Sequence, residues 1–368
     1  MTLPTSGQIS LNQIKTEFKK GNNLLDYLGE GYAKSNKPLS VTDFYGRTSA
    51  GEEWIAISSE TDNTIGSTDD LSDIAWNGSL FCAVGNNGTC ATSPDGINWT
   101  LRPSLETAVG GEPMYAVTWN GSFFCAVGRL CLCATSPDGI NWTRRPSLET
   151  EMGASGSMFS VIWSGTHFCA VGSTGKCATS PDGINWTNQP GLYAAVGRNN
   201  INSVAWSGSV FCAVGKDSAC ATSPDGVTWT NQPSLWPTIN GYPLESIEWN
   251  GSVFCTVGGY GKCATSPDGA NWTDQPSLNS PGPLRYTCQA LIWAGKKFVT
   301  VGTYQIAATS GDGSDWDIRP SMEEAITTSP RMKGIAWNGE KFVAVGSGGI
   351  IVISTTRTAY VKAKRAMI

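Results

Sequence analysis

The sequence contains few charged residues and a single histidine. Asp, Glu, Lys and Arg make up 15% of its 368 residues, against about 25% in typical globular domains. The net charge of −5 argues against nucleic acid as a partner, because neutralising phosphates requires clustered Lys and Arg. No apolar run approaches the roughly 18 residues of a membrane span, and the first residues lack the basic start and apolar core of a secretory signal. We therefore expect synthesis in a cytosol, no membrane insertion and no nucleic-acid partner.

Motifs for metal or cofactor binding are also missing from the sequence. His167 is the only histidine, and the twelve cysteines show no C-x2-C spacing of the kind found at zinc sites. We expect neither a metal nor a cofactor.

Glycine and tryptophan, by contrast, are abundant, with 43 and 15 residues, and they mark an internal repeat. The tryptophan of a W-N/S/A-G triplet recurs at steps of 43 or 44 residues. These tryptophans are Trp76, Trp119, Trp163, Trp206, Trp249, Trp293 and Trp337. Seven units of this length match the four-stranded blades of a β-propeller.

Each unit has the sequence pattern of four short strands separated by tight turns. Glycine ends the first two strands, and a P-D-G turn follows the third, where proline presets φ and glycine accepts a positive φ. Short strands with turns every 8–12 residues are typical of all-β proteins. In the first unit the strands are expected at 72–78, 80–85, 89–93 and 97–100.

The last unit lacks its fourth strand, and the missing strand is found near the start of the chain. Residues 51–59 align with the fourth strand of the first unit, with Trp54 over Trp99. We predict an all-β fold, a seven-bladed β-propeller over 51–355 that this N-terminal strand closes by completing the last blade, which leaves no open sheet edge. Residues 1–50 would form a small helical module and residues 356–368 a basic tail.

The phrase S-P-D-G-x-x-W ends each of the first five units and resembles the Asp box of sialidases and related propellers, with one residue fewer between Asp and Trp. In that family the box is a structural turn remote from the active site, and an aspartate can accept hydrogen bonds from its own turn. We therefore interpret these aspartates as structural, and both tryptophans of each unit as mostly core. The aspartates are Asp95, Asp138, Asp182, Asp225 and Asp268.

Ten cysteines form pairs eight residues apart, on the second and third strands of a blade. The pairs are Cys82 and Cys90, Cys125 and Cys133, Cys169 and Cys177, Cys212 and Cys220, and Cys255 and Cys263. Where one member is replaced, as in Val299 with Ala307, so is the other, which indicates contact. With a bulge in the turn the two would lie opposite each other, close enough for a disulfide. Five disulfides and five pairs of buried thiols both remain open.

The variable parts of the repeat are predicted to share one face. In a propeller, the turns between second and third strands and the links between blades lie on one face, whereas the nearly constant W-N-G-S and S-P-D-G turns lie on the other. Variable loops on a rigid scaffold are where binding sites are expected, although the links could instead fold over the rim as packing. The candidate ligand-binding residues are Trp236, Tyr193, Tyr242, Tyr260, Tyr304, Arg129, Lys216 and Arg198.

Catalysis finds little support in the sequence. Resemblance to sialidases implies an arginine cluster and a tyrosine nucleophile, but the arginines are scattered, and Arg102, Arg145 and Arg319 recur at one repeat position. A carboxylate pair for glycoside hydrolysis is defined by spatial distance rather than by sequence spacing, so a glycosidase remains an alternative. We expect that the protein is not an enzyme.

The first fifty residues are of a different kind from the repeat. Two capping-box spacings, at Ser10 and Ser40, predict two short helices, and the segments "ISLNQIKTEF" and "LSVTDFYG" resemble a short N-terminal module of tailed-bacteriophage structural proteins, especially tail fibres and other appendages. The resemblance implies a virion component that attaches by its N-terminus to other virion proteins. The candidate attachment residues are Leu11, Ile14, Phe18, Phe44 and Tyr45.

Together these patterns predict a bacteriophage virion protein, extracellular in the mature particle, that recognises the host surface through the variable face of its propeller. Aromatic and hydrogen-bonding side chains on that face suit a glycan or a protein. A purely structural role in capsid, collar or baseplate is the first alternative, and a glycosidase that degrades the host envelope is the second. A homo-oligomer is compatible with either role.

Overall fold

The computed structural model describes residues 53–57, 65–66, 69–278, 286–319, 322, 326 and 330–355. The predicted helical module with Leu11, Ile14, Phe18, Phe44 and Tyr45, and the basic tail, lie outside the described residues. Within the described part of the chain, no helix has the length and apolar character that crossing a membrane requires.

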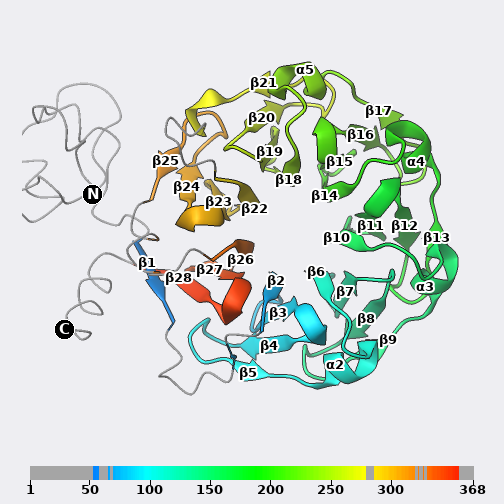
Figure 1. Cartoon of the computed structure of the whole chain (residues 1–368), viewed down its shortest axis with the longest axis vertical. Helices are drawn as coiled ribbons and strands as arrows, with labels where there is room; N and C mark the ends of the chain where they lie inside the picture. Colours follow the sequence, from blue (N-terminus) through cyan, green and yellow to red (C-terminus); the bar gives the residue numbers. More distant parts are fainter. Residues whose placement is uncertain are drawn as a thin grey trace, which may run out of the picture. The chain divides into compact units, whose positions relative to one another are not determined.

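The described chain forms seven four-stranded antiparallel sheets arranged in a ring (Figure 1). Blade 1 contains β2 (Leu71–Trp76), β3 (Phe81–Gly85), β4 (Cys90–Ser93) and β5 (Thr100–Leu101). Blade 2 contains β6 (Met114–Trp119), β7 (Phe124–Gly128), β8 (Cys133–Ser136) and β9 (Thr143–Arg144). Blade 3 contains β10 (Met158–Trp163), β11 (Phe168–Gly172), β12 (Cys177–Ser180) and β13 (Thr187–Asn188). Blade 4 contains β14 (Ile201–Trp206), β15 (Phe211–Gly215), β16 (Cys220–Ser223) and β17 (Thr230–Asn231).

The remaining blades follow the same plan. Blade 5 contains β18 (Leu244–Trp249), β19 (Phe254–Gly258), β20 (Cys263–Ser266) and β21 (Thr273–Asp274). Blade 6 contains β22 (Cys288–Trp293), β23 (Phe298–Gly302), β24 (Ala307–Ser310) and β25 (Asp317–Ile318). Blade 7 contains β26 (Met332–Trp337), β27 (Phe342–Gly346), β28 (Ile351–Thr355) and β1 (Glu53–Ala56). The predicted seven-bladed propeller is confirmed.

The seam of the ring lies in blade 7, as the repeat phase predicts. The strand order there is β1-β28-β27-β26, so a strand from the start of the chain completes the sheet that the last strands begin. The backbone N–H of Ile57 donates to the carbonyl of Ile351 at 2.9 Å. This pairing removes the exposed edge that β28 would otherwise present.

Short helices occupy the links between blades, along the outer rim of the ring (Figure 1). They are α2 (Ser104–Val109), α3 (Ser147–Met152), α4 (Gly191–Val196) and α5 (Leu235–Ile239), with the 3-10 turn η6 (Pro276–Leu278) in the next link. Further 3-10 turns join second to third strands: η3 (Asn86–Gly88), η4 (Ser173–Gly175), η5 (Lys216–Ser218), η7 (Thr303–Gln305) and η8 (Ser347–Gly349).

Each blade is built on a phenylalanine at the start of its second strand and on one tryptophan. Phe81 and its six equivalents are no more than 1% exposed. Trp99 and its equivalents on the fourth strand are buried too, and the Trp99 indole N–H donates to the Gly96 carbonyl at 2.9 Å. The other tryptophan of each unit, also predicted to be mostly core, packs against the core from the inner strand. Trp76 and its equivalents are only partly buried, because the first strand forms the inner wall of the ring and its tryptophan covers the phenylalanine, at 4.2–4.8 Å between ring centroids.

The paired cysteines touch, but they do not lie opposite each other as expected. In blade 1 Cys82 is paired with Thr92, and Cys90 with Val84, so the two cysteines are diagonal neighbours on one face of the sheet. Their Sγ atoms are 3.8 Å apart, and the five pairs span 3.8–4.0 Å. All twelve cysteines are free thiols in the structure. The connecting turn sets this offset: the N–H of Gly85 donates to the carbonyl of Thr89 at 2.9 Å, and this register places Val84 rather than Cys82 opposite Cys90.

The S-P-D-G turn uses its carboxylate internally. Asp95 accepts the backbone N–H groups of Ile97 and Asn98, each at 2.8 Å, and the side-chain amide of Asn98 at 2.7 Å. The hydroxyl of Ser93 donates to the same carboxylate at 3.0 Å. These bonds hold the pKa of Asp95 at about 2, below its ordinary value, even though partial burial acts to raise it. The carboxylate thus stabilises the turn.

Candidate functional site

The turns and links divide between two faces of the ring. We call the face with η3 and its equivalents and the links the link face, and the face with the W-N-G-S and S-P-D-G turns the turn face. On the link face, α2 packs against η3 so closely that a Cβ on Gly88 would lie 2.7 Å from the Cα of Glu106. On the turn face, the ammonium of Lys341 donates to the carbonyl of Asp95 at 3.2 Å.

The links are packed helices rather than open loops. On α2, Leu105 and Val109 are buried against the rim, and the equivalent leucines on the following helices are buried as well. The inner sides of the links therefore pack over the rim, as the alternative interpretation of the sequence expected. Their outer sides display side chains to solvent, including Tyr193 on α4 and Trp236 on α5. Trp236 is 57% exposed.

The tip of each turn between second and third strands has a left-handed backbone. Six of these tips carry a residue other than glycine, a conformation that is unfavourable for bulky side chains. The seven tip residues are Asn87, Leu130, Thr174, Asp217, Tyr260, Tyr304 and Gly348. Strained positions with exposed aromatic side chains, as at Tyr260 and Tyr304, are more typical of functional loops than of scaffold.

An aromatic cluster lies on the link face where blades 4 and 5 meet. We define it as Trp236, Tyr242 and Tyr260. The rings of Tyr242 and Tyr260 are 4.8 Å apart between centroids, and the ammonium of Lys262 lies 5.8 Å from the centre of the Tyr242 ring. Trp236 packs over Gly241, where a Cβ would come within 2.9 Å of the indole nitrogen. Tyr242 and Tyr260 are thus in ring contact, and Trp236 lies beside Gly241, the residue that precedes Tyr242.

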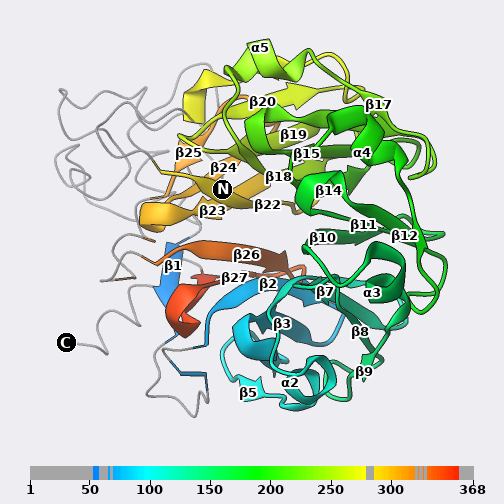
Figure 2. The ribbon, with the colours of Figure 1, turned by 45° about the vertical axis from the view of Figure 1, so that its right-hand side comes forward.

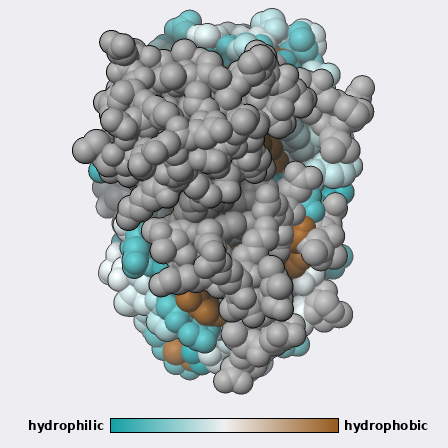
Figure 3. Space-filling view, turned by 90° about the vertical axis from the view of Figure 1, so that its left-hand side faces the viewer, coloured by the Kyte–Doolittle hydropathy of each residue, from teal (hydrophilic) through white to brown (hydrophobic). Residues whose placement is uncertain are grey.

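The other candidate residues do not join this cluster. Arg129 and Lys216 are exposed at the turns of blades 2 and 4, and Arg129 forms an ion pair with Glu112 at 3.0 Å. Tyr193, Arg198 and Tyr304 are exposed on other parts of the rim. In the side view of Figure 3, the coloured surface is mainly hydrophilic with isolated hydrophobic patches.

A central cavity, which we call the channel, lies in the middle of the ring, and it was not predicted from the sequence. The innermost strands that line it are seen around the ring's centre in Figure 2. They enclose a cavity of about 450 Å³ to which all seven blades contribute. Each innermost strand carries a bulge between its first and third residues, as at Leu71 to Asp73 in β2. The bulge places an extra residue on the inner wall.

The second residue of each innermost strand lies at the channel mouth near the link face. These residues are Ser72, Tyr115, Phe159, Asn202, Glu245, Gln289 and Lys333. One side of the mouth is aromatic, with Tyr115 and Phe159 at 5.8 Å between centroids. The other side is polar, and the Asn202 amide donates to Glu245 at 3.2 Å. Lys333 forms an ion pair with Asp70 at 3.3 Å.

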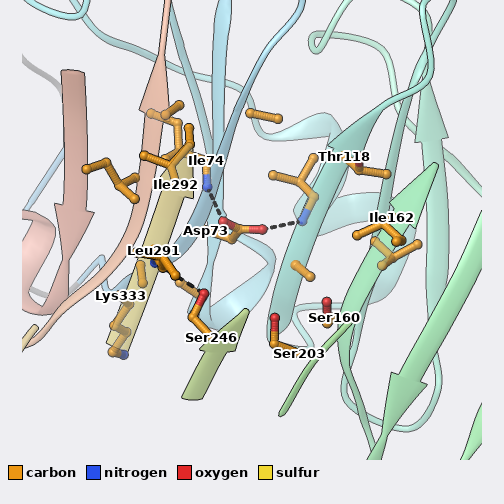
Figure 4. Close-up of a pocket in the computed structure, with 18 of the residues that line it drawn as sticks. Asp73, Ile74, Thr118, Ser160, Ile162, Ser203, Ser246, Leu291, Ile292 and Lys333 are labelled. Carbon is orange, nitrogen blue, oxygen red and sulfur yellow. Dashed lines mark hydrogen bonds between the residues drawn. The ribbon is translucent and has the colours of Figure 1, made fainter. Parts of the chain in front are cut away.

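The third residue of several innermost strands ties one blade to the next (Figure 4). The carboxylate of Asp73 accepts the backbone N–H of Val117 in blade 2 at 2.9 Å, and that of Ile74 at 2.8 Å. Ser203 and Ser246 accept the corresponding N–H groups of Ile247 and Leu291, at 3.3 and 3.1 Å. In blades 4 and 5 a serine thus accepts the type of hydrogen bond that an aspartate accepts in blade 1.

Two carboxyl groups, those of Asp73 and Glu248, line the channel. Removal from solvent raises the pKa of Asp73 to about 7, against the two N–H bonds that it accepts. Removal from solvent also raises the pKa of Glu248 to about 8, and the charge of Asp73 adds to that effect. Burial raises the pKa of Glu245 at the mouth. Raised carboxyl pKa values in a cavity mark candidate functional groups.

A signal for this channel was present in the sequence. The repeats agree closely at core positions, such as the phenylalanine of each second strand, but the second residue of the first strand is different in all seven units. Acids at the third and fifth positions occur once each, as Asp73 and Glu248. Position-by-position comparison of the units marks these residues as exceptions.

The architecture defines a closed seven-bladed β-propeller whose variable residues gather on the link face and at the channel mouth. No protein-family model matches the sequence, and no curated protein matches it. Solved propellers do match its fold. A structure described as YCF48 bound to D1 peptide superposes with a TM-score of 0.63 at 16% identity, over 83% of this chain and 95% of that one.

Two further solved structures extend the similarity. YCF48 from Cyanidioschyzon merolae gives a TM-score of 0.61 at 15% identity, over 82% of this chain and 98% of that one. The WD40 β-propeller domain of Doa1 gives 0.56 at 9% identity, over 84% and 98%. At such identities the similarity establishes the propeller fold alone.

Proposed function

We propose that this protein is a recognition component of a tailed-bacteriophage virion, and that its propeller binds a host-surface glycan through the aromatic cluster. Two sources of support stand behind the proposal. The N-terminal segments resemble phage appendage modules, and the link face carries Trp236, Tyr242 and Tyr260 where blades 4 and 5 meet.

The cluster has the composition that a sugar site needs. Tyrosine and tryptophan combine a flat apolar face with a polar edge, so one ring can cover the apolar face of a sugar while its polar edge hydrogen-bonds to hydroxyl groups. Lys262 beside Tyr242, with Asp274 at 3.9 Å from its ammonium, adds charged hydrogen-bonding groups at the border. Aromatic residues with few rotatable bonds also bind at a low cost in conformational entropy.

The test is binding of the full chain to an array of bacterial surface glycans. We expect Trp236→Ala and Tyr260→Asn each to reduce the bound signal about tenfold or more, since each removes a ring from the cluster. Tyr304→Asn is the matched control, because it makes the same change at the same turn position of the next blade. Unchanged glycan binding in both cluster variants would show that the aromatic cluster is not the binding site.

A second candidate function is a structural contact within the virion, through the turn face. Ile140, Ile184 and Val227 hold one position of the S-P-D-G turn in three successive blades, and all three are exposed. The equivalent residues of blades 5 and 6 are Ala270 and Ser314. Ile140→Ser with Ile184→Ser should impair incorporation into particles if this face makes the contact. Normal particles with lost adsorption in the cluster variants favour recognition.

A polysaccharide-degrading activity has a direct test as well. Purified protein incubated with host polysaccharide should leave the chain length unchanged if the propeller only binds. Shortening that disappears in Asp73→Ser or Glu248→Ala would assign catalysis to the channel instead.

A further inference from the structure

The fold does not require the two acidic side chains of the central channel, Asp73 and Glu248. Asp73 ties blade 1 to blade 2, but Ser203 and Ser246 make the same type of bond in other blades. At the position of Glu248 the other six units have Ala, Thr or Ile. Neither carboxylate is needed to build its strand, and placing each away from solvent costs free energy.

These acids also have no cationic partner within the described part of the chain. The ion pairs there involve other residues, and the one channel lysine, Lys333, is bound to Asp70. Glu245 at the mouth accepts from the neutral amide of Asn202. The side-chain oxygen of Gln289, also at the mouth, is buried without a hydrogen bond among the described residues. Among the described residues, the channel therefore holds two carboxyl groups without a cationic partner and an amide oxygen without a donor.

The shape and the aromatic side of the mouth specify the kind of cation. A cavity of about 450 Å³ lies within the range of sites for small organic ligands. Tyr115 and Phe159 can cover an alkyl chain or attract a cation to their ring faces. The described residues contain no group of three or more side chains able to hold a metal ion. An alkylammonium group fits this combination better than a bare ion.

We propose that the central channel binds an alkylammonium ligand, with the ammonium held by Asp73 and Glu248 and the alkyl chain along Tyr115 and Phe159. The ligand class includes a free polyamine and the lysine side chain of a partner protein. This site is separate from the aromatic cluster, and the proposal does not depend on glycan recognition.

Isothermal titration calorimetry at pH 9 and low salt tests the proposal with three probes. They are spermidine, the peptide acetyl-Gly-Lys-Gly-amide, and the same peptide with norleucine in place of lysine. We expect spermidine or the lysine peptide to bind, and which of them binds distinguishes a polyamine from a partner's lysine. The norleucine peptide, which has no charge, should not bind.

Variants taken from the protein's own repeats keep the fold while removing the acids. Asp73→Ser and Glu248→Ala introduce residues found at the same positions of other blades, and each should weaken binding about tenfold or more. Tyr115→Ser, which copies Ser72, should weaken it less. Glu340→Ser is the matched control, because it removes an exposed acid of the turn face and copies Ser79. It should bind as the unaltered protein does.

Binding should also weaken as the pH falls from 9 to 6, because Asp73 and Glu248, whose pKa values are raised to about 7 and 8, become protonated. Within the described chain, Glu245, Lys333 and Asp70 are the other acidic and basic groups at the channel mouth. The proposal is overturned if neither cation binds at pH 9, if the norleucine peptide binds equally well, or if the Asp73→Ser Glu248→Ala double variant binds unchanged. If Asp73→Ser does not fold, Glu248→Ala alone decides, because Glu248 makes no tie to another blade.

Discussion

The thiol of Cys90 donates a hydrogen bond to the carbonyl of Gly139, in the S-P-D-G turn of the next blade, at 3.6 Å between Sγ and O. The indole of Trp142 donates to the same carbonyl at 3.2 Å. Five blades repeat the thiol contact, at 3.5–3.8 Å. The third-strand cysteines therefore join neighbouring blades, and their partners on the second strand pack beside them.

This contact predicts that the cysteine pairs remain thiols. A disulfide requires Cα atoms about 4.4–6.8 Å apart, whereas diagonal neighbours on a sheet lie about 7–8 Å apart, so oxidation would need a backbone shift. The hydrogen bond that Cys82 donates to Cys90, together with burial, raises the pKa of Cys82 well above its ordinary value. We expect no alkylation of these cysteines in the native protein at pH 8, and all twelve thiols to react after unfolding. Protection of ten thiols after unfolding without reductant would contradict this.

The contact between Cys90 and Gly139 also affects how much the free energy of unfolding falls when a cysteine pair is replaced. Cys82→Val with Cys90→Ala copies Val299 and Ala307 of blade 6, so volume is nearly conserved and two weak thiol hydrogen bonds are lost. We expect a loss of about 1 kcal/mol or less, measured as the free energy of unfolding in urea. Cys90→Asp, which buries an unpaired charge, should cost far more and serves as the contrast.

The aspartates of the turns predict how the protein responds to acid. Hydrogen bonds lower the pKa of Asp138 to about 2, as they do for Asp95, Asp182 and Asp268. A lowered carboxyl pKa contributes stability that is present above the ordinary value of 3.8 and is lost as the pH falls toward 2. We expect the melting temperature to fall steeply between pH 4 and 2. Asp138→Asn keeps a carbonyl acceptor but cannot titrate, so its melting temperature should fall less over the same range. An equal fall would contradict the assignment.

The seam predicts a sensitivity at Ile57. Its N–H donates to the carbonyl of Ile351 at 2.9 Å, and proline has no N–H to donate. Ile57→Pro should therefore lower the free energy of unfolding by about 1–3 kcal/mol, whereas Ile57→Val keeps the donor and should have little effect. Thermal unfolding followed by tryptophan fluorescence measures the difference.

The channel acids predict an opposite response at alkaline pH. The pKa values of Asp73 and Glu248 are raised to about 7 and 8, above their unfolded values, so ionising them destabilises the fold. Stability should increase as the pH falls from 9 to 6, and the gain should shrink in Asp73→Ser Glu248→Ala. Because 1 kcal/mol shifts the melting temperature by about 2–4 °C in domains of 150–250 residues, differential scanning calorimetry should detect it. A melting temperature that is flat over this range would contradict the burial of these charges.

The repeat determined how much could be predicted from sequence. The spacing of the W-N/S/A-G tryptophans defines the blades, and the alignment of Trp54 with Trp99 defines the seam, because both are local properties of each unit. Trp76 covers Phe81 but is only partly buried, and the sequence pattern does not show how far a residue on an inner strand is covered. The contact of Tyr242 with Tyr260, and the presence of Asp73 and Glu248 in one cavity, depend on how the blades are placed in space, and the repeat spacing does not predict them.

The turn tips give a final prediction, in which stability and binding change in opposite directions. Tyr260 and Tyr304 have φ of 60° and 54°, a conformation that costs a bulky residue about 1 kcal/mol or more and that asparagine tolerates better. The equivalent residue of blade 1 is Asn87, with φ of 56°.

No ring contacts Tyr304 among the described residues, so Tyr304→Asn should raise the melting temperature by a few degrees. Tyr260→Asn also loses the contact with Tyr242, worth about 0.5–1.5 kcal/mol, so its melting temperature should stay nearly unchanged while glycan binding falls. Calorimetry and the glycan array on both variants separate the two effects. A large destabilisation by Tyr260→Asn would mean that the ring is held there for packing, and the aromatic cluster would then be part of the scaffold.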